Sequence, residues 1–120
     1  MARNMTMKTA WTIGLALPGV EEGTTYGTPA LKVRGRVICC IPTHRSAESN
    51  SLVVNVEFEE RAELLAAAPD TYYLPDHYAN YPFVLVRLSR VHADALRDLL
   101  SGARKRAQTK RPQRAGRRPR

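Results

Sequence analysis

The connections between short strand segments constrain the fold of this chain more than any other feature. In the first half of the sequence, strands are expected near Glu22 to Tyr26, from Ala30 to Arg34, and through "RVICCI". Only a few residues, around Gly27 and Gly35, separate these segments. Because two parallel strands need a crossover of about a dozen residues or more, these strands are expected to pair antiparallel.

The turns between these strands carry further information. Pro29 marks an edge or a corner of the sheet, since proline donates no backbone hydrogen bond. The second turn predicts a β-hairpin in one of two forms. A two-residue turn at Arg34-Gly35 would place Val33 opposite Arg36. A three-residue turn would instead place Lys32 opposite that arginine, and the sequence leaves both open.

Three helices are expected around the strands. The first runs from about Thr6 to Leu17 and is capped by its first residue, the second covers "EFEERAELLAAAP", and the third begins near Ala93. The side chains of the second helix that should face the core are Phe58, Ala62 and Leu65. The residues of the third helix that should face the core are Leu96, Leu99, Leu100 and Ala103.

The remaining strands complete one domain. "LVVNV" precedes the second helix, and "DTYYLPD" and "YPFVLVRLS" follow it, the last being apolar enough to be a central strand. This order predicts an α+β fold in which an antiparallel sheet has its helices packed on one face. The domain is expected to span residues 1–103, and residues 104–120 are expected to form a disordered basic tail.

The formal net charge of +8 is distributed unevenly. Residues 1–103 hold ten Lys or Arg against eleven Asp or Glu, whereas residues 104–120 hold nine Lys or Arg and no acid. The domain is therefore nearly neutral, and the positive charge belongs to the tail. The tail has no hydrophobic period, so it cannot bury enough apolar surface to fold alone.

The cysteines and histidines indicate neither disulfides nor metal. Cys39 and Cys40 are adjacent, so their side chains point to opposite faces of a strand, which predicts a reduced, cytoplasmic protein. His44, His77 and His92 are scattered without the spacing of metal ligands, and no cofactor is expected. No stretch approaches the roughly 20 apolar residues that span a bilayer.

Four short motifs together resemble one known family. They are Leu17-Pro18-Gly19, Tyr26-Gly27-x-Pro29, Lys32-Val33-Arg34-Gly35 and His77-Tyr78-x-x-Tyr81-Pro82. Over roughly residues 10–105 the chain is similar to the MmcQ/YjbR family of small bacterial proteins, and the tail lies outside this region. The resemblance implies a CyaY-like fold and carries the family's label of DNA-binding protein.

Two sets of cations are candidates for nucleic-acid contact. In the hairpin, Lys32, Arg34 and Arg36 either contact phosphate or form a solvated side that prevents edge-to-edge pairing. In the tail, the candidates are Arg104, Lys105, Arg106, Lys110, Arg111, Arg114, Arg117, Arg118 and Arg120. If these nine all met phosphates, log K would fall with log salt at a slope of roughly −8, without base preference. The tail could instead serve only solubility, and an anionic membrane surface is a weaker alternative.

Aromatic residues around His77 form a second candidate site. Tyr26, His77 and Tyr81 would line a ligand cleft. Neither a nucleophile nor a paired carboxylate stands at recognisable spacing beside them, so we expect no enzymatic activity. The alternative interpretation is a Tyr-rich loop that packs over the sheet, with His77 hydrogen-bonded to backbone.

The sequence thus favours a monomer that binds nucleic acid, DNA by the family label, without sequence preference. The tail would supply most of the affinity, and the hairpin cations would orient the domain. A basic groove made by these cations with Arg87 or Arg90 would support this function. The alternative is a module that binds a small molecule or a protein partner in the cleft and has no nucleic-acid role.

Overall fold

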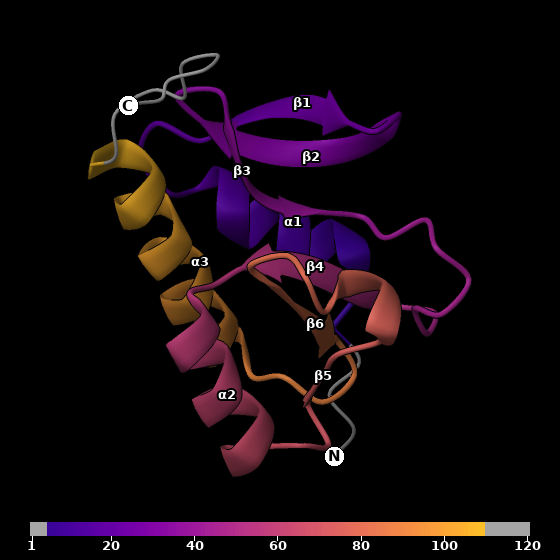
Figure 1. Ribbon diagram of the computed structural model, residues 1–120. Coiled ribbons are helices and arrows are strands. Elements are labelled where there is room, and N and C mark those ends of the chain that lie inside the picture. Colours follow the sequence, from indigo (N-terminus) through magenta and orange to yellow (C-terminus); the bar gives the residue numbers. More distant parts are fainter. Residues whose placement is uncertain (1–4, 110–120) are drawn as a thin grey trace, which may run out of the picture.

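The computed structural model describes residues 5–109, and Figure 1 shows how their elements are arranged. The elements in chain order are α1 (Met7–Leu15), β1 (Glu21–Thr25), β2 (Thr28–Val33), β3 (Arg36–Cys40), β4 (Ser51–Asn55), α2 (Phe58–Ala67), β5 (Tyr72–Tyr73), the 3-10 helix η1 (Asp76–Tyr78), β6 (Phe83–Arg87) and α3 (Ala93–Thr109). The six strands form one antiparallel sheet in the order β1-β2-β3-β4-β6-β5. The predicted α+β class is confirmed, and β6 is paired on both sides, as its apolar sequence indicated.

Both tight hairpin turns have two residues in the left-handed region. Tyr26-Gly27 joins β1 to β2 with φ angles of 52° and 77°, and Arg34-Gly35 joins β2 to β3 with φ angles of 53° and 81°. Val33 lies opposite Arg36, so the two-residue form of the second turn is the one observed. Two successive positive φ angles are typical of a type I′ turn, which favours Asn-Gly and makes a tyrosine or an arginine at the first position unusual.

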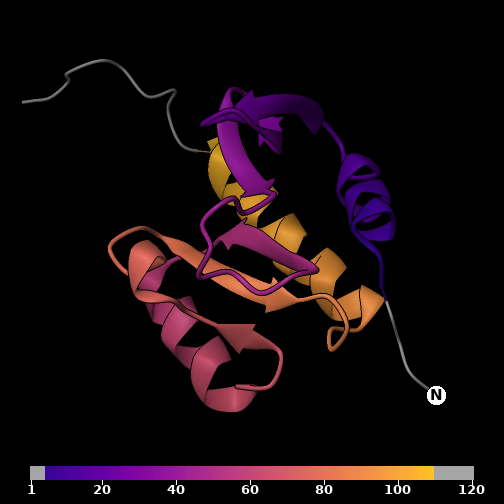
Figure 2. The same ribbon diagram turned by 90° about the vertical axis from the view of Figure 1, so that its right-hand side faces the viewer.

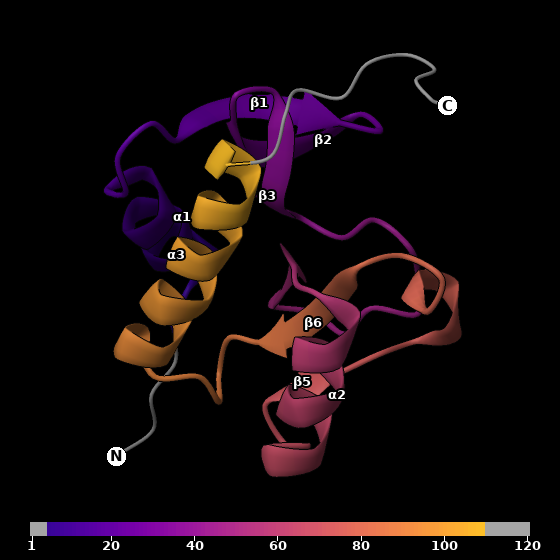
Figure 3. The same cartoon turned by 60° about the vertical axis from the view of Figure 1, so that its left-hand side comes forward.

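The helices cover one face of the sheet, and Figure 3 shows α3 in front of β3 with α1 beside it. α3 contacts β2, β3 and β4, while α2 packs against β5 and β6. We call the buried layer between helices and sheet the helix-side core. Its fully buried members from the sheet include Leu31, Ile38, Leu52, Val54, Val84 and Val86, and α3 contributes the four predicted residues Leu96, Leu99, Leu100 and Ala103.

The opposite face of the sheet is covered only in part, and we call it the open face. A smaller cluster of buried residues, which includes Ala30, Cys40, Val53 and Leu85, lies there. Figure 2 shows the loop after β3 and η1 on the side of the sheet away from α1. Cys39 belongs to the helix-side core and Cys40 to the open face, as adjacent strand positions require. Both thiols are free and buried.

Of the inward face expected for α2, only Leu65 is confirmed. Phe58 is 52 % exposed and Ala62 is exposed, whereas Leu64 and Leu65 contact the helix-side core. α2 packs against the short β5 and β6 at one end of the sheet, so the second half of the helix, rather than its first turn, meets the core.

The C-terminal boundary of the domain also differs from the expectation. α3 continues to Thr109, and Ala107 is buried in the helix-side core. Residues 104–109, expected in the disordered tail, are therefore the last turns of a packed helix. Residues 110–120 lie outside the described part of the chain.

The contact between α1 and the sheet can be tested at Gly14. A Cβ atom at Gly14 would lie 2.5 Å from Cδ1 of Leu31, which is fully buried. Gly14→Ala should therefore lower the free energy of unfolding by about 1 kcal/mol, although alanine favours helix. Urea unfolding measures this change, and a stabilised variant would contradict the close packing.

The matched control for Gly14 is Gly102→Ala in α3. The added methyl group would meet only Nη1 of Arg106, at 3.6 Å. This substitution should raise the free energy of unfolding by about 0.5 to 1 kcal/mol, because alanine has a higher helix propensity than glycine and its methyl group meets no clash.

Candidate functional site

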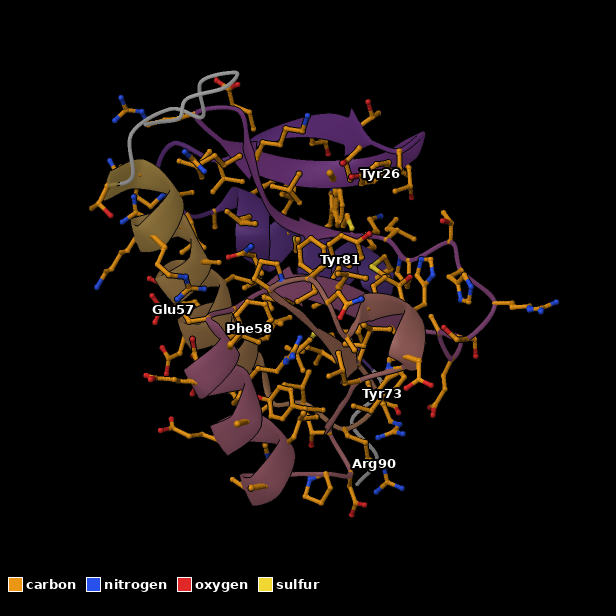
Figure 4. The ribbon with its side chains drawn as sticks, viewed as in Figure 1. Tyr26, Glu57, Phe58, Tyr73, Tyr81 and Arg90 are labelled. Atoms are coloured by element: carbon orange, nitrogen blue, oxygen red, sulfur yellow. The ribbon has the colours of Figure 1, made fainter. Side chains whose placement is uncertain are left out.

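The structure brings Tyr26, His77 and Tyr81 together in one cleft on the open face. The cleft has a volume of about 440 Å³ and is bordered by the β1–β2 turn, the loop after β3 and the segment from η1 to β6. Figure 4 shows Tyr26 of the β1–β2 turn and Tyr81 of the segment from η1 to β6 on the same side of the molecule. The buried residues that line the cleft are Thr28, Cys40, Val53 and Tyr78. Tyr26, His77 and Tyr81 thus line one cleft, and these four buried residues are among its other lining residues.

The lining of this cleft is mostly apolar. Aromatic, aliphatic and hydroxyl side chains form it together with Cys40 and His77, with no Lys, Arg, Asp or Glu among them. The Thr28 hydroxyl donates to the carbonyl oxygen of Ile41 at 2.9 Å, and burial raises the pKa of the Cys40 thiol to about 11. The cleft therefore suits flat, uncharged groups.

His44 and His77 form a stacked pair beside the cleft. Their ring centroids are 3.7 Å apart and their planes differ by 10°. The backbone N–H of Ser46 donates to Nδ1 of His44 at 3.1 Å, which requires that nitrogen to be unprotonated. Desolvation, His77 and Arg45 together lower the pKa of His44. No spacing in the sequence indicated this contact, because it joins the loop after β3 to η1.

Protonation of His44 should weaken the loop that borders the cleft. Because the folded state lowers the pKa of His44 below its ordinary value of 6.5, its stabilising contribution is present above that pH and is lost as the pH falls. The urea midpoint should decrease between about pH 7.5 and about pH 5.5, and His44→Gln should reduce this dependence. Equal decreases in both proteins would contradict the role of His44.

Arg61 of α2 holds the segment that carries Tyr81. Its guanidinium donates to the carbonyl oxygens of Ala79, Tyr81 and Phe83 at 3.2, 2.8 and 3.3 Å. The guanidinium carbon also lies 4.7 Å from the centre of the Phe58 ring. The ring of Tyr81 stacks on that of Phe83 with centroids 6.2 Å apart. Tyr81 is therefore a positioned side chain at the border of the cleft.

Arg87 orders the loop before β4. Its guanidinium donates to both carboxylate oxygens of Glu48 at 2.8 Å and lies 4.3 Å from the centre of the Tyr73 ring. It also donates to the carbonyl oxygens of Pro69 and Asp70. The hydrogen bond from Arg87 lowers the pKa of Glu48. This bidentate contact holds the loop before β4 against the end of β6.

The basic groove that would support nucleic-acid binding, made by Lys32, Arg34 and Arg36 with Arg87 or Arg90, is not formed by these residues. Arg87 is engaged by Glu48, and Arg90 lies at the opposite end of the molecule from the β2–β3 turn (Figure 4). The hairpin cations themselves diverge. Lys32 lies opposite Val37 on the open face, whereas Arg36 faces Val33, a member of the helix-side core.

Arg34 instead joins the hairpin turn to the end of α3. Its Nη1 donates to the carbonyl oxygen of Gln108 at 3.2 Å. Arg104, on the same side of the helix, donates to the carbonyl oxygen of Pro18 at 3.4 Å and to Oε1 of Gln108 at 2.6 Å. These acceptors are uncharged oxygens, so in these contacts no carboxylate offsets the positive charge of either guanidinium group.

We call the cations of the two segments that this contact joins the basic corner, namely Arg34 and Arg36 of the hairpin and Arg104 and Lys105 of α3. Arg106 does not belong to it. Its Nη1 lies 3.4 Å from Oε1 of Glu60, and its Nη2 donates to the carbonyl oxygen of Asn55 at 2.8 Å. The other six candidate cations, Lys110, Arg111, Arg114, Arg117, Arg118 and Arg120, lie outside the described residues.

Known proteins share this architecture. A family model described as YjbR matches residues 15–106, a range that contains both the cleft and the basic corner. The chain belongs to the YjbR family. This confirms the resemblance in the sequence motifs. The YjbR chain also shares its fold with the crystal structure of Deinococcus radiodurans protein DR2400, described with the domain DUF419, at a TM-score of 0.70 and 24% identity over 89% of this chain and 81% of that chain. None of the curated proteins matches the sequence.

Two further properties concern the described part of the YjbR chain. Among residues 5–109, no helix has both the length and the apolar character needed to cross a membrane. In the same residues, no three His, Cys, Asp or Glu side chains gather closely enough to hold a metal ion.

Proposed function

We propose that this YjbR protein binds nucleic acid without sequence preference, through the basic corner and the six cations that follow Thr109. The observation that carries this proposal is the hydrogen bond from Arg34 to the carbonyl oxygen of Gln108. It sets the hairpin turn beside the last turn of α3, so cations distant in sequence lie on one side of the domain at the start of the basic segment.

The hydrogen bonds of the basic corner favour phosphate contact. A helix C-terminus carries partial negative charge that repels anions, and Arg34 offsets it by donating to one of the terminal carbonyl groups. Arg34 and Arg104 are positioned by neutral acceptors, so no carboxylate competes with a phosphate for them. Arginine matches phosphate geometry well, and phosphate contacts need no particular base.

The six cations beyond Thr109 should supply most of the salt dependence. Replacing Lys110, Arg111, Arg114, Arg117, Arg118 and Arg120 together by Gln removes their charge and leaves α3 intact. We expect the slope of log K against log salt to become less steep by about 5, from about 0.9 per phosphate contact. Fluorescence anisotropy with a labelled duplex at several salt concentrations measures the slope. An unchanged slope would contradict the role of this segment.

The contribution of the corner can be separated from stability at Arg34. Arg34→Asn removes the charge but places Asn-Gly in a type I′ turn, so the hairpin should be at least as stable. We expect binding to a duplex to weaken about threefold to tenfold, because one oriented phosphate contact is lost. The control is Arg90→Asn, which removes an equal charge at the far end of the molecule (Figure 4) and should have a smaller effect. Equal effects would show that only net charge matters.

The neutral cleft favours a second candidate function, a small-molecule binding module without a nucleic-acid role. Its volume of about 440 Å³ is within the usual range of ligand sites. A panel of metabolites tested for thermal stabilisation separates the two candidates. Stabilisation of the wild type by a metabolite, together with no binding to any nucleic acid, would favour the second.

A further inference from the structure

Tyr26 occupies a position that stability alone does not explain. Its side chain is 94 % exposed, so the ring gains almost nothing from burial. Its φ angle of 52° is strained for a bulky residue, and asparagine would suit this turn better. Strained backbone that persists in a fold often holds a side chain for binding. Tyr26 therefore presents an aromatic ring to solvent at the border of the cleft.

Tyr81 presents a second ring at the same cleft (Figure 4). It is 52 % exposed, and the hydrogen bonds from Arg61 hold its backbone. Two exposed aromatic rings thus border a cleft whose floor is formed by buried neutral side chains such as Val53 and Tyr78. A flat ring can stack on such side chains. The lining contains no Lys, Arg, Asp or Glu that would favour a charged ligand.

We propose that the cleft binds an unpaired nucleobase of a single strand, stacked against Tyr26 and Tyr81. This inference rests on the proposed nucleic-acid binding. It specifies that the base bound in the cleft comes from a strand with unpaired bases. Stacking on aromatic rings tolerates any base, which agrees with binding that lacks sequence preference. In a duplex the bases are paired and stacked on each other, so they do not reach the cleft without being extruded.

The positions of the cations favour a strand over a free nucleotide. No Lys or Arg lines the cleft, so a mononucleotide bound there would have no ammonium or guanidinium group for its phosphate. Lys32 lies outside the cleft on the same open face. Lys32 follows Thr28 and Ala30 along the open face, and its side chain passes over Gly23, where a Cβ atom would lie 3.4 Å from Cδ of Lys32. A strand can place its base in the cleft and its neighbouring phosphates over such cations.

The test uses the full chain and fluorescence anisotropy with three labelled probes at one low salt concentration. The probes are a short oligothymidine, an abasic strand of equal length and charge, and a duplex of equal length. Tyr26→Asn and Tyr81→Ala are the test variants, and the first should fold well because it creates an Asn-Gly turn. Leu15→Ala is the control, since Leu15 of α1 is an apolar side chain that is 38 % exposed and does not line the cleft.

We expect oligothymidine to bind the wild type about tenfold more tightly than the abasic strand, the difference that base stacking on aromatic rings supplies. Both tyrosine variants should lose this difference and keep their affinity for the abasic strand, whereas Leu15→Ala should keep the difference. Equal binding of oligothymidine and the abasic strand by the wild type, or unchanged oligothymidine binding by Tyr26→Asn, would overturn the inference.

Two further outcomes separate this inference from the proposed function. The duplex and the abasic strand could bind in a salt-dependent way while oligothymidine binds no more tightly than the abasic strand. This result would support the proposed function and overturn only the inference about the cleft. Absence of binding to all three probes would overturn both. Competition by free thymidine as effectively as by oligothymidine, per nucleotide, would make the cleft a nucleoside site and overturn the strand assignment.

Discussion

The packing of α3 against the sheet is the interaction on which the rest of this structure depends. Its buried stripe, which includes Leu96, Leu100 and Ala103, lies against β2, β3 and β4. Each large apolar side chain buried in this way contributes about 1.5 to 3 kcal/mol before the entropy cost of ordering the chain. Because the stripe continues to Ala107, the helix runs on to Thr109, and the carbonyl oxygen of Gln108 near its end accepts a hydrogen bond from Arg34 of the hairpin turn. The position of the basic corner therefore follows from the packing of the core.

The two hairpin turns share a feature that links stability to function. Each is a type I′ turn whose second residue is glycine, and each has a side chain at its first position that the turn disfavours, Tyr26 in one and Arg34 in the other. Sites at which local preference is violated without a packing gain are often functional. Tyr26 borders the cleft and Arg34 contacts the end of α3. Both proposals thus use residues that a sequence selected only for stability would replace.

Much of the fold could be predicted from the sequence, because it follows from local pattern. The short connections required antiparallel pairing, and the period of α3 identified its buried stripe. The cleft was anticipated in part, since Tyr26 and Tyr81 lie in family motifs. The His44–His77 stack and the directions of individual cationic side chains could not be predicted from the sequence. Arg104 and Arg106 are two residues apart, and only the helical phase through Thr109 sends one to Pro18 and the other to Glu60.

We propose that the folded domain, and not only the segment after Thr109, contacts nucleic acid. This contact can be measured as the change in backbone amide NMR shifts when the ¹⁵N-labelled full chain is titrated with a short oligothymidine. We expect shifts in the two hairpin turns, at Gly27 and Gly35, and at Lys105 near the end of α3, with little change around Arg90. Shifts confined to residues after Thr109, with both turns unaffected, would contradict it.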